Sequence, residues 1–194
     1  SEMCIRARDI NDAGLRSSVQ NGILNTELGI PFRTPAEGHN VAFTSLWDNY
    51  PDSLEIPLKG KASRAYLLMA GSTNHMQCHI DNGVIRIYYK DGTRDVMFLR
   101  NPDNWPPIEH IFFEDGLAFN RHTPALYRLR LKTGEISNNF GEELGFPGAS
   151  RELDGGAAVL LEMPLNPGKK LSHLVLETLS NDVVIGLMSI TLQR

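Results

Sequence analysis

Two loops of the chain combine flat aromatic rings with short hydrogen-bonding side chains. The residues concerned are Trp47, Asp48, Asn49 and Tyr50 in the first loop, and Asn104 and Trp105 in the second. This combination suits sugar recognition, because C–H faces stack on aromatic rings while amide and carboxylate groups hold hydroxyls. These six residues are therefore the candidate ligand-binding residues. The alternative is that each Trp closes the end of a core or contacts a neighbouring domain.

Known catalytic motifs are absent from the sequence. There is no Gly-x-Ser-x-Gly elbow, no phosphate-binding glycine loop, no dinucleotide fingerprint and no His-Glu-x-x-His motif. Glu109-His110 and Glu114-Asp115 offer acid and base groups of the kind that glycoside hydrolysis uses. A chain with 23 acidic residues offers many such pairs, however. We therefore predict no catalytic residues, with a stand-alone glycoside hydrolase that uses loop carboxylates as the alternative.

The six histidines show no metal-binding spacing. His75 and His79 are four residues apart, which places them on one face only in a helix, whereas the surrounding sequence predicts a strand. We therefore predict no metal site and no cofactor. A structural calcium ion is an alternative at Asp48, Asn49 and Asp52, whose side-chain oxygens lie close together in the sequence.

The elements that position these residues have the pattern of an all-β protein. Strands are predicted at residues 41–44, 53–58, 64–70, 76–80, 84–90, 93–100, 111–113, 125–131, 157–163, 171–179 and 183–192. The nearly continuous apolar run 64–70 predicts a central strand covered on both faces. Glycine-containing turns before Val84 and after Lys90 predict an antiparallel meander over residues 76–100. Within it, alternation places Ile85, Ile87 and Tyr89 on one face.

Short strands at regular spacing, without a long helix or a repeat, favour a β-sandwich of the jelly-roll type over a doubly wound fold. We predict a single domain over residues 1–194, in which 1–40 form an irregular lead-in and 41–194 form the sandwich core. The glycine-rich segment 137–155 is expected to be a long surface loop, and the last strand is expected to bend or bulge at Gly186.

An apolar strand, a Gly-Lys-Ala turn and a Leu-rich strand follow one another in residues 54–68. Together with residues 29–32 (Gly-Ile-Pro-Phe) and the closing strands in 170–192, this order resembles galactose-binding-domain-like sandwiches. In particular, it resembles an uncharacterised C-terminal module of large glycoside-hydrolase-like proteins from glycan-degrading gut bacteria. The resemblance implies a secreted, periplasmic or cell-surface location and an upstream domain in a longer parent chain. It supplies no catalytic residues.

Bulk properties exclude two classes of partner. The net charge is −4 and the basic residues are dispersed, which argues against a nucleic-acid footprint. No apolar run approaches about 20 residues, so no membrane span is expected, and the chain starts without a signal-peptide pattern. Cys4 and Cys78 are the only cysteines, and the sequence does not choose between a disulfide and two thiols.

These observations lead to one expected function with two alternatives. We expect a non-catalytic accessory module of a secreted carbohydrate-active protein, which binds carbohydrate or supports a catalytic domain. A purely structural docking domain without a ligand is the first alternative, and the stand-alone hydrolase is the second. The sequence indicates neither the ligand nor the oligomeric state.

Overall fold

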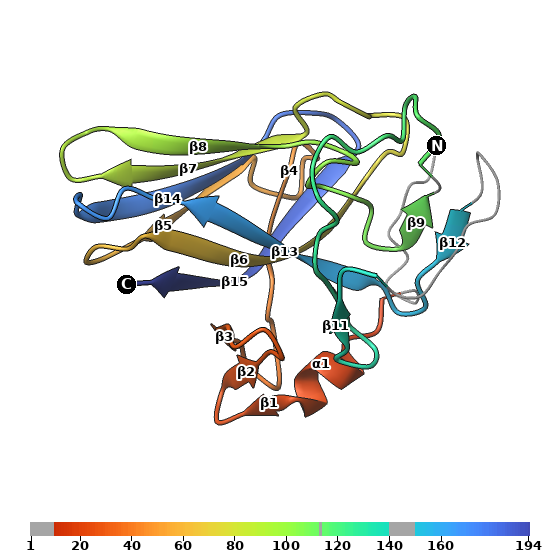
Figure 1. The fold of residues 1–194 in the computed structure, drawn as a ribbon, viewed down its shortest axis with the longest axis horizontal. Coiled ribbons are helices and arrows are strands. Elements are labelled where there is room, and N and C mark those ends of the chain that lie inside the picture. Colours follow the sequence, from red (N-terminus) through yellow and green to blue (C-terminus); the bar gives the residue numbers. More distant parts are fainter. Residues whose placement is uncertain (1–9, 113, 140–149) are drawn as a thin grey trace.

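Two antiparallel β-sheets packed face to face form the body of the molecule (Figure 1). The computed structural model describes residues 10–112, 114–139 and 150–194. Strands account for 46% of the chain and helix for 3%, which confirms the prediction of an all-β sandwich.

The larger sheet has six strands in the order β11-β10-β13-β6-β15-β4, with antiparallel neighbours throughout. Its strands are β4 (Ala42–Ser45), β6 (Arg64–Thr73), β10 (Arg128–Arg130), β11 (Ile136–Ser137), β13 (Ala157–Pro164) and β15 (Val183–Gln193). β6 lies inside this sheet, and residues 67–71 are buried one after another. This confirms the predicted central strand that is covered on both faces.

The smaller sheet has four strands in the order β5-β14-β7-β8. These are β5 (Ser53–Pro57), β7 (Gly83–Tyr89), β8 (Arg94–Leu99) and β14 (Leu171–Thr178). Gly92 turns the chain between β7 and β8 with a φ of +83°, a conformation that glycine adopts without strain. Ile85, Ile87 and Tyr89 are buried in the core between the two sheets, as their alternation predicts.

A third layer covers the other face of the six-stranded sheet. It consists of α1 (Ala13–Ser17) and a small sheet of β1 (Val19–Gln20), β2 (Ile23–Asn25) and β3 (Pro31–Arg33), which lie below the large sheet in Figure 1. Leu15, Leu24 and Phe32 from this layer form a second buried cluster with Leu68 and Leu160 of the sheet. The predicted lead-in therefore contains short regular elements that bury apolar surface.

Residues 76–80 do not form the predicted first strand of the meander. They belong to a turn-rich connection between β6 and β7, in which Cys78 makes a single bridge to Asn101. The side chain of Asn74 accepts a hydrogen bond from the Met76 N–H, and the Asn82 amide donates to the carbonyl groups of residues 77 and 80. These side chains therefore satisfy backbone groups that a strand ladder would otherwise use.

Two other expectations are corrected in detail. The register of β15 against β6 shifts between Leu187 and Ser189, so the irregularity lies beyond Gly186. Residues 150–152 are not loop: β12 (Ser150–Glu152) pairs with β9 (His110–Phe112) in a two-stranded sheet. The remainder of the predicted surface loop lies partly outside the described residues, at 140–149.

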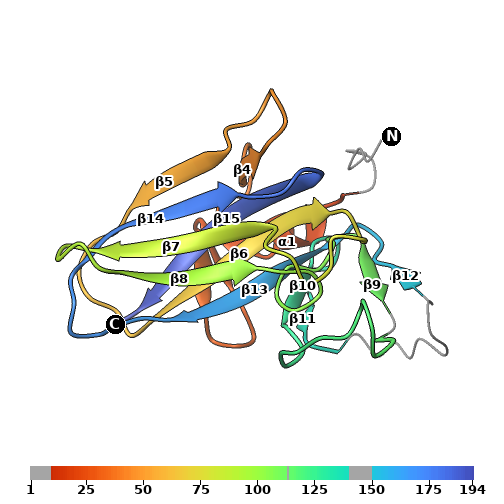
Figure 2. The same cartoon turned by 90° about the horizontal axis from the view of Figure 1, so that it is seen from above.

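The connections from β6 to β7 and from β8 to β9 lie at the end of the sandwich opposite the hairpin that joins β7 and β8 (Figure 2). The backbone N–H of His79 donates to the carbonyl of Asn101 at 2.7 Å, and that of Ile108 donates to Gly71 at 3.1 Å. The loops before β7 and before β9 are thereby held against each other and against the end of β6. We call this region the loop end, and it carries the candidate site.

Candidate metal centre

Four of the six histidines lie at the loop end, in two clusters that each contain two imidazoles and one carboxylate. The inner cluster comprises His75, Glu109 and His110, and the outer cluster comprises His79, Asp103 and His122. In each cluster, one potential ligand atom per residue lies within 4.8 Å of the corresponding atoms of the other two. Sequence spacing predicted no such convergence.

The turn after β6 explains why His75 and His79 serve different clusters. The Gln77 N–H donates to the Asn74 carbonyl at 2.9 Å, which closes a tight turn around His75. His79 has a φ of +56°, in the left-handed region that non-glycine residues rarely adopt. The backbone between the two imidazoles is therefore irregular, and the period of a strand or a helix does not apply to them.

In the inner cluster, a side chain of β6 hydrogen-bonds to the carboxylate of Glu109. The Ser72 hydroxyl lies 3.0 Å from both carboxylate oxygens. The backbone carbonyl of Glu109 accepts a hydrogen bond from Leu153 N at 2.7 Å, which fixes the turn that precedes β9. A carboxylate oriented in this way resembles a metal ligand with its supporting hydrogen bond already in place.

The two inner imidazoles lie close together and half-buried. The ring centroids of His75 and His110 are 5.2 Å apart with the rings nearly perpendicular, and His110 Nδ1 lies 3.9 Å from Glu109 Oε1. Burial lowers the pKa of His75, the neighbouring His110 lowers it further, and Glu109 opposes the change. The imidazole of His75 is therefore neutral at pH 7, which is the form that binds a metal.

Two imidazoles and a carboxylate are the protein ligands of zinc sites that keep one coordination position open. Zn²⁺ holds such atoms at about 2.1 Å, which in a tetrahedral site places them about 3.4 Å from one another. The inner ligand atoms, within 4.8 Å of one another, need small side-chain rotations to reach this arrangement. Imidazole nitrogen also argues against Ca²⁺, which prefers six to eight oxygen ligands.

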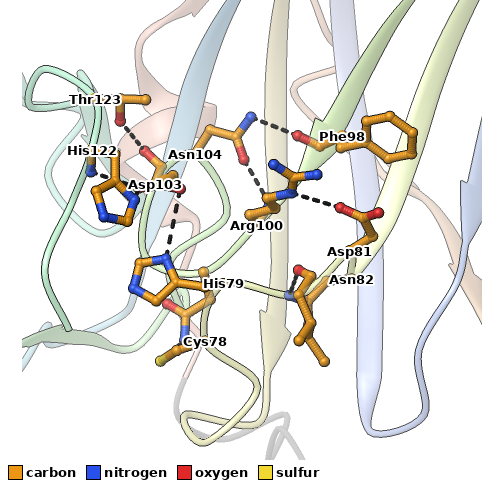
Figure 3. A network of polar contacts seen from close by, with 12 residues as sticks. Cys78, His79, Asp81, Asn82, Phe98, Arg100, Asp103, Asn104, His122 and Thr123 are labelled. Carbon is orange, nitrogen blue, oxygen red and sulfur yellow. Dashed lines mark hydrogen bonds and ion pairs between the residues drawn. The ribbon is translucent and has the colours of Figure 1, made fainter. Parts of the chain in front are cut away.

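In the outer cluster, Asp103 lies between two histidines (Figure 3). Its carboxylate is 3.8 Å from His79 Nδ1 and 3.5 Å from His122 Nδ1. The ring centroids of the two histidines are 4.7 Å apart. The side chain of Asp103 is largely buried and that of His122 is exposed, so this cluster opens to solvent on one side.

The second predicted ligand-binding loop supports the core. Trp105 is 1% exposed and belongs to the core between the sheets. Asn104 is tied to the backbone, since its Oδ1 accepts from Arg100 N at 2.7 Å and its Nδ2 donates to Phe98 O at 2.8 Å. The burial of Trp105 favours the core-closing alternative for this ring, and the side chain of Asn104 is engaged by its own loop.

The first predicted ligand-binding loop lies at the surface, between β4 and β5. Trp47 and Tyr50 are half-buried, with ring centroids 6.3 Å apart, and Asp48 and Asn49 between them are exposed. Asp52 accepts a hydrogen bond from the neighbouring Ser53 hydroxyl at 3.1 Å. Among the described residues, the acidic side chains of this loop join no convergent group of His, Cys, Asp and Glu.

The other carboxylates considered for acid–base chemistry have structural partners. Glu114 forms an ion pair with Arg121. Asp115 accepts hydrogen bonds from the N–H groups of Leu117 at 2.7 Å and Phe119 at 3.1 Å, so it organises its own turn.

Cys78 lies between His75 and His79 in the sequence. Its thiol donates to the carbonyl of His75 at 3.0 Å, and the Asn101 side-chain amide donates to its sulfur at 3.3 Å. Burial, and secondly the charge of Asp115, raise the pKa of this thiol. It is therefore a protonated, structural group at neutral pH. Cys4 lies outside the described residues, so the question of a disulfide stays as the sequence left it.

Comparison with known proteins adds no relative: no family model, no curated protein and no solved structure matches the chain. In the part of the chain that the structure describes, no helix is long and apolar enough to cross a membrane.

Proposed function

We propose that the protein is a non-catalytic β-sandwich module that binds a divalent transition-metal ion, Zn²⁺ in the first instance, at His75, Glu109 and His110. The observation that carries the proposal is the convergence of these three side chains within 4.8 Å from two separate connections. Support comes from Ser72, which orients the Glu109 carboxylate, and from the neutral state of His75.

An ion at the inner cluster would connect two parts of the chain that are far apart in the sequence. His75 follows β6, whereas Glu109 immediately precedes β9 and His110 is its first residue, paired with Glu152 of β12. A metal bound by both segments fastens the loop end to the central strand of the large sheet. Because metal binding to the native state alone adds to folding stability, the expected role is to order the loop end.

Titration calorimetry with ZnCl₂ on tag-free protein at pH 7.5 tests the proposal. We expect His75→Ala and His110→Ala each to remove one binding event that the wild type shows, with far-UV circular dichroism unchanged. His39→Ala is the matched control, because His39 is exposed and belongs to neither cluster. Unchanged zinc binding in folded His75→Ala and His110→Ala proteins would refute the proposal.

Carbohydrate binding is a second candidate function, and the exposed loop around Trp47 favours it. Trp47 and Tyr50 are accessible in part, and the exposed Asp48 and Asn49 lie beside them. Such a loop offers ring faces and hydroxyl-binding groups to a sugar. A glycan array with wild type and Trp47→Ala tests this candidate, and an array without any Trp47-dependent signal would leave the metal site alone.

The role of the module in a larger protein follows from the resemblance of residues 29–194 to accessory domains of secreted carbohydrate-active proteins. We propose accordingly that the chain supports an upstream catalytic domain outside the cytoplasm. A parent gene that encodes a catalytic domain upstream of this module would agree with the proposal. If neither zinc nor glycans bind, the remaining interpretation is a docking domain without a ligand.

A further inference from the structure

We propose that His79, Asp103 and His122 form a second, independent site for a divalent transition-metal ion, and that an ion there fastens the segment 114–127 to the sandwich. We call this segment, which connects β9 to β10, the excursion. The proposal goes beyond the inner site, because the two clusters share no residue.

His79 and His122 both lie close to the carboxylate of Asp103. Asp103 Oδ2 lies 3.8 Å from His79 Nδ1, and Asp103 Oδ1 lies 3.5 Å from His122 Nδ1. The three side chains come from three separate connections and point toward one another in Figure 3. Imidazoles paired with a carboxylate suit Zn²⁺ and related ions, and the exposed side of the cluster leaves room for a water ligand.

Other groups already support this carboxylate. The His122 N–H donates to Asp103 Oδ1 at 2.7 Å, and the Thr123 hydroxyl donates to the Asp103 carbonyl at 2.7 Å. These contacts hold Asp103 and His122 in register before any ion binds. The nearby Arg100 is occupied by Asp81, at 2.6 Å, so it does not compete for Asp103 in this arrangement.

The same cluster contains an unsatisfied nitrogen. His79 Nε2 is buried and has no hydrogen-bond partner among the described residues. Burying a polar atom without a partner costs free energy, so the position of this ring needs a compensating interaction. A metal ion coordinated through Nε2 itself would supply that interaction.

The excursion is held to the sandwich by the hydrogen bonds of His122 and Thr123 to Asp103, by the packing of Leu126 against the core, and by the Tyr127 carbonyl, which accepts from Leu160 N at 2.9 Å. None of residues 114–127, all of which the structure describes, is buried, and Leu117 is 79% exposed. Its turn is stabilised from within by Asp115 and by the ion pair between Glu114 and Arg121. Segments with few buried apolar contacts open at low free-energy cost, so one coordination bond to His122 changes their dynamics strongly.

Zinc stoichiometry and hydrogen exchange together test the inference. We expect wild type and His39→Ala to bind two equivalents of Zn²⁺, and His122→Ala and His75→Ala to bind one each. Zn²⁺ at about 100 times its Kd slows amide exchange in the excursion by up to about 100-fold, a limit set by the linkage relation. In His122→Ala, zinc leaves exchange there unchanged. Tag-free protein is required, and Co²⁺ spectra without thiolate charge-transfer bands exclude Cys78 as the ligand.

The outcomes separate this inference from the proposed function. One equivalent that His75→Ala removes and His122→Ala retains overturns the outer site and leaves the inner site standing. One equivalent with the opposite pattern supports the outer site and refutes the inner one. Two equivalents without slower exchange in the excursion overturn the fastening role. Asp103→Asn adds a check, because it preserves the shape of the side chain while removing its charge.

Discussion

A single hydroxyl sets the position of the inner carboxylate. Ser72 of β6 lies with its hydroxyl 3.0 Å from each carboxylate oxygen of Glu109. Partners of this kind hold a ligand in its binding geometry, and their removal typically weakens metal affinity by about 10- to 100-fold. Ser72 is therefore a positioning residue.

Ser72→Ala is expected to raise the zinc Kd of the inner site by about 10- to 100-fold. The inner site should still bind one equivalent. Competition with a chromophoric chelator measures the change. The exposed Ser53→Ala, whose hydroxyl contacts only Asp52 among the described interactions, is the matched control. An unaltered Kd in Ser72→Ala would show that Glu109 needs no support or does not bind the ion.

The two tryptophans are expected to behave differently when they are truncated. Trp105 lies in the core, so Trp105→Ala should lower the free energy of unfolding by about 3–5 kcal/mol. Trp47 is half-buried in a surface loop, and Trp47→Ala should cost under about 1 kcal/mol. Urea denaturation measures both values, and similar losses would contradict the assignment of Trp105 to the core and Trp47 to the surface.

At the scale of elements, the strands that alternate or run apolar could be predicted from the sequence. Side chains alternate along a strand, so Ile85, Ile87 and Tyr89 share one face. This apolar face packs into the core. The connection from Asn74 to Asn82 could not be predicted in this way. Its residues have strand-like character, but two asparagine side chains take the backbone hydrogen bonds and turn the chain instead.

Gly186 shows how a close backbone approach can resemble a bulge signal. A Cβ at this position would lie 2.2 Å from the Ala70 carbonyl oxygen of the paired strand. Gly186→Ala is therefore expected to destabilise the protein by about 3 kcal/mol, at the upper end of overpacking effects. Gly168→Ala, whose Cβ would meet only a side-chain oxygen at 3.2 Å, is the control in thermal unfolding. Equal melting temperatures would contradict this close approach.

Tyr89, at the end of β7, makes the free energy of unfolding decrease as the pH becomes alkaline. Burial, followed by the hydrogen bond to Asp95, raises its pKa to about 12. Its hydroxyl also accepts a hydrogen bond from Asn166 N at 2.8 Å. Because the folded state favours the neutral phenol, this contribution is complete below the unfolded pKa of about 10. It is lost as the pH rises toward about 12.

The free energy of unfolding, measured between pH 9 and pH 11.5, is expected to fall more steeply for wild type than for Tyr89→Phe. The difference between the two slopes isolates the phenol from lysines that titrate in the same range. Parallel curves would mean that Tyr89 titrates alike in both states.

At the scale of the whole molecule, zinc should stabilise the fold through linkage. An ion at about 100 times its Kd adds about 2.7 kcal/mol per site to the free energy of unfolding when it binds only the native state. For a domain of this size, that corresponds to about 5–10 °C in Tm. Scanning calorimetry with and without Zn²⁺ measures the shift, and Mg²⁺ at the same concentration should give little, since it prefers oxygen ligands.

The inner cluster could not be predicted from the spacing of residues in the sequence. His75 and its partners at Glu109 and His110 are separated by more than one hairpin, and only the packing of whole connections brings them together. Spacing rules describe ligands on one helix or one loop; they predict that His75 and His79 do not converge on each other, and the structure places the two residues in separate clusters. In the sequence, Glu109-His110 is an adjacent acid–base pair, and His75 lies more than 30 residues before it, outside the range of any spacing rule.

The most direct test of the central claim is an anomalous difference map at the zinc absorption edge, from crystals of the tag-free protein grown with Zn²⁺. We expect a peak at the inner cluster, about 2.1 Å from a nitrogen of His75, a nitrogen of His110 and a carboxylate oxygen of Glu109. A map of the occupied crystals whose peaks lie away from these three side chains would contradict it.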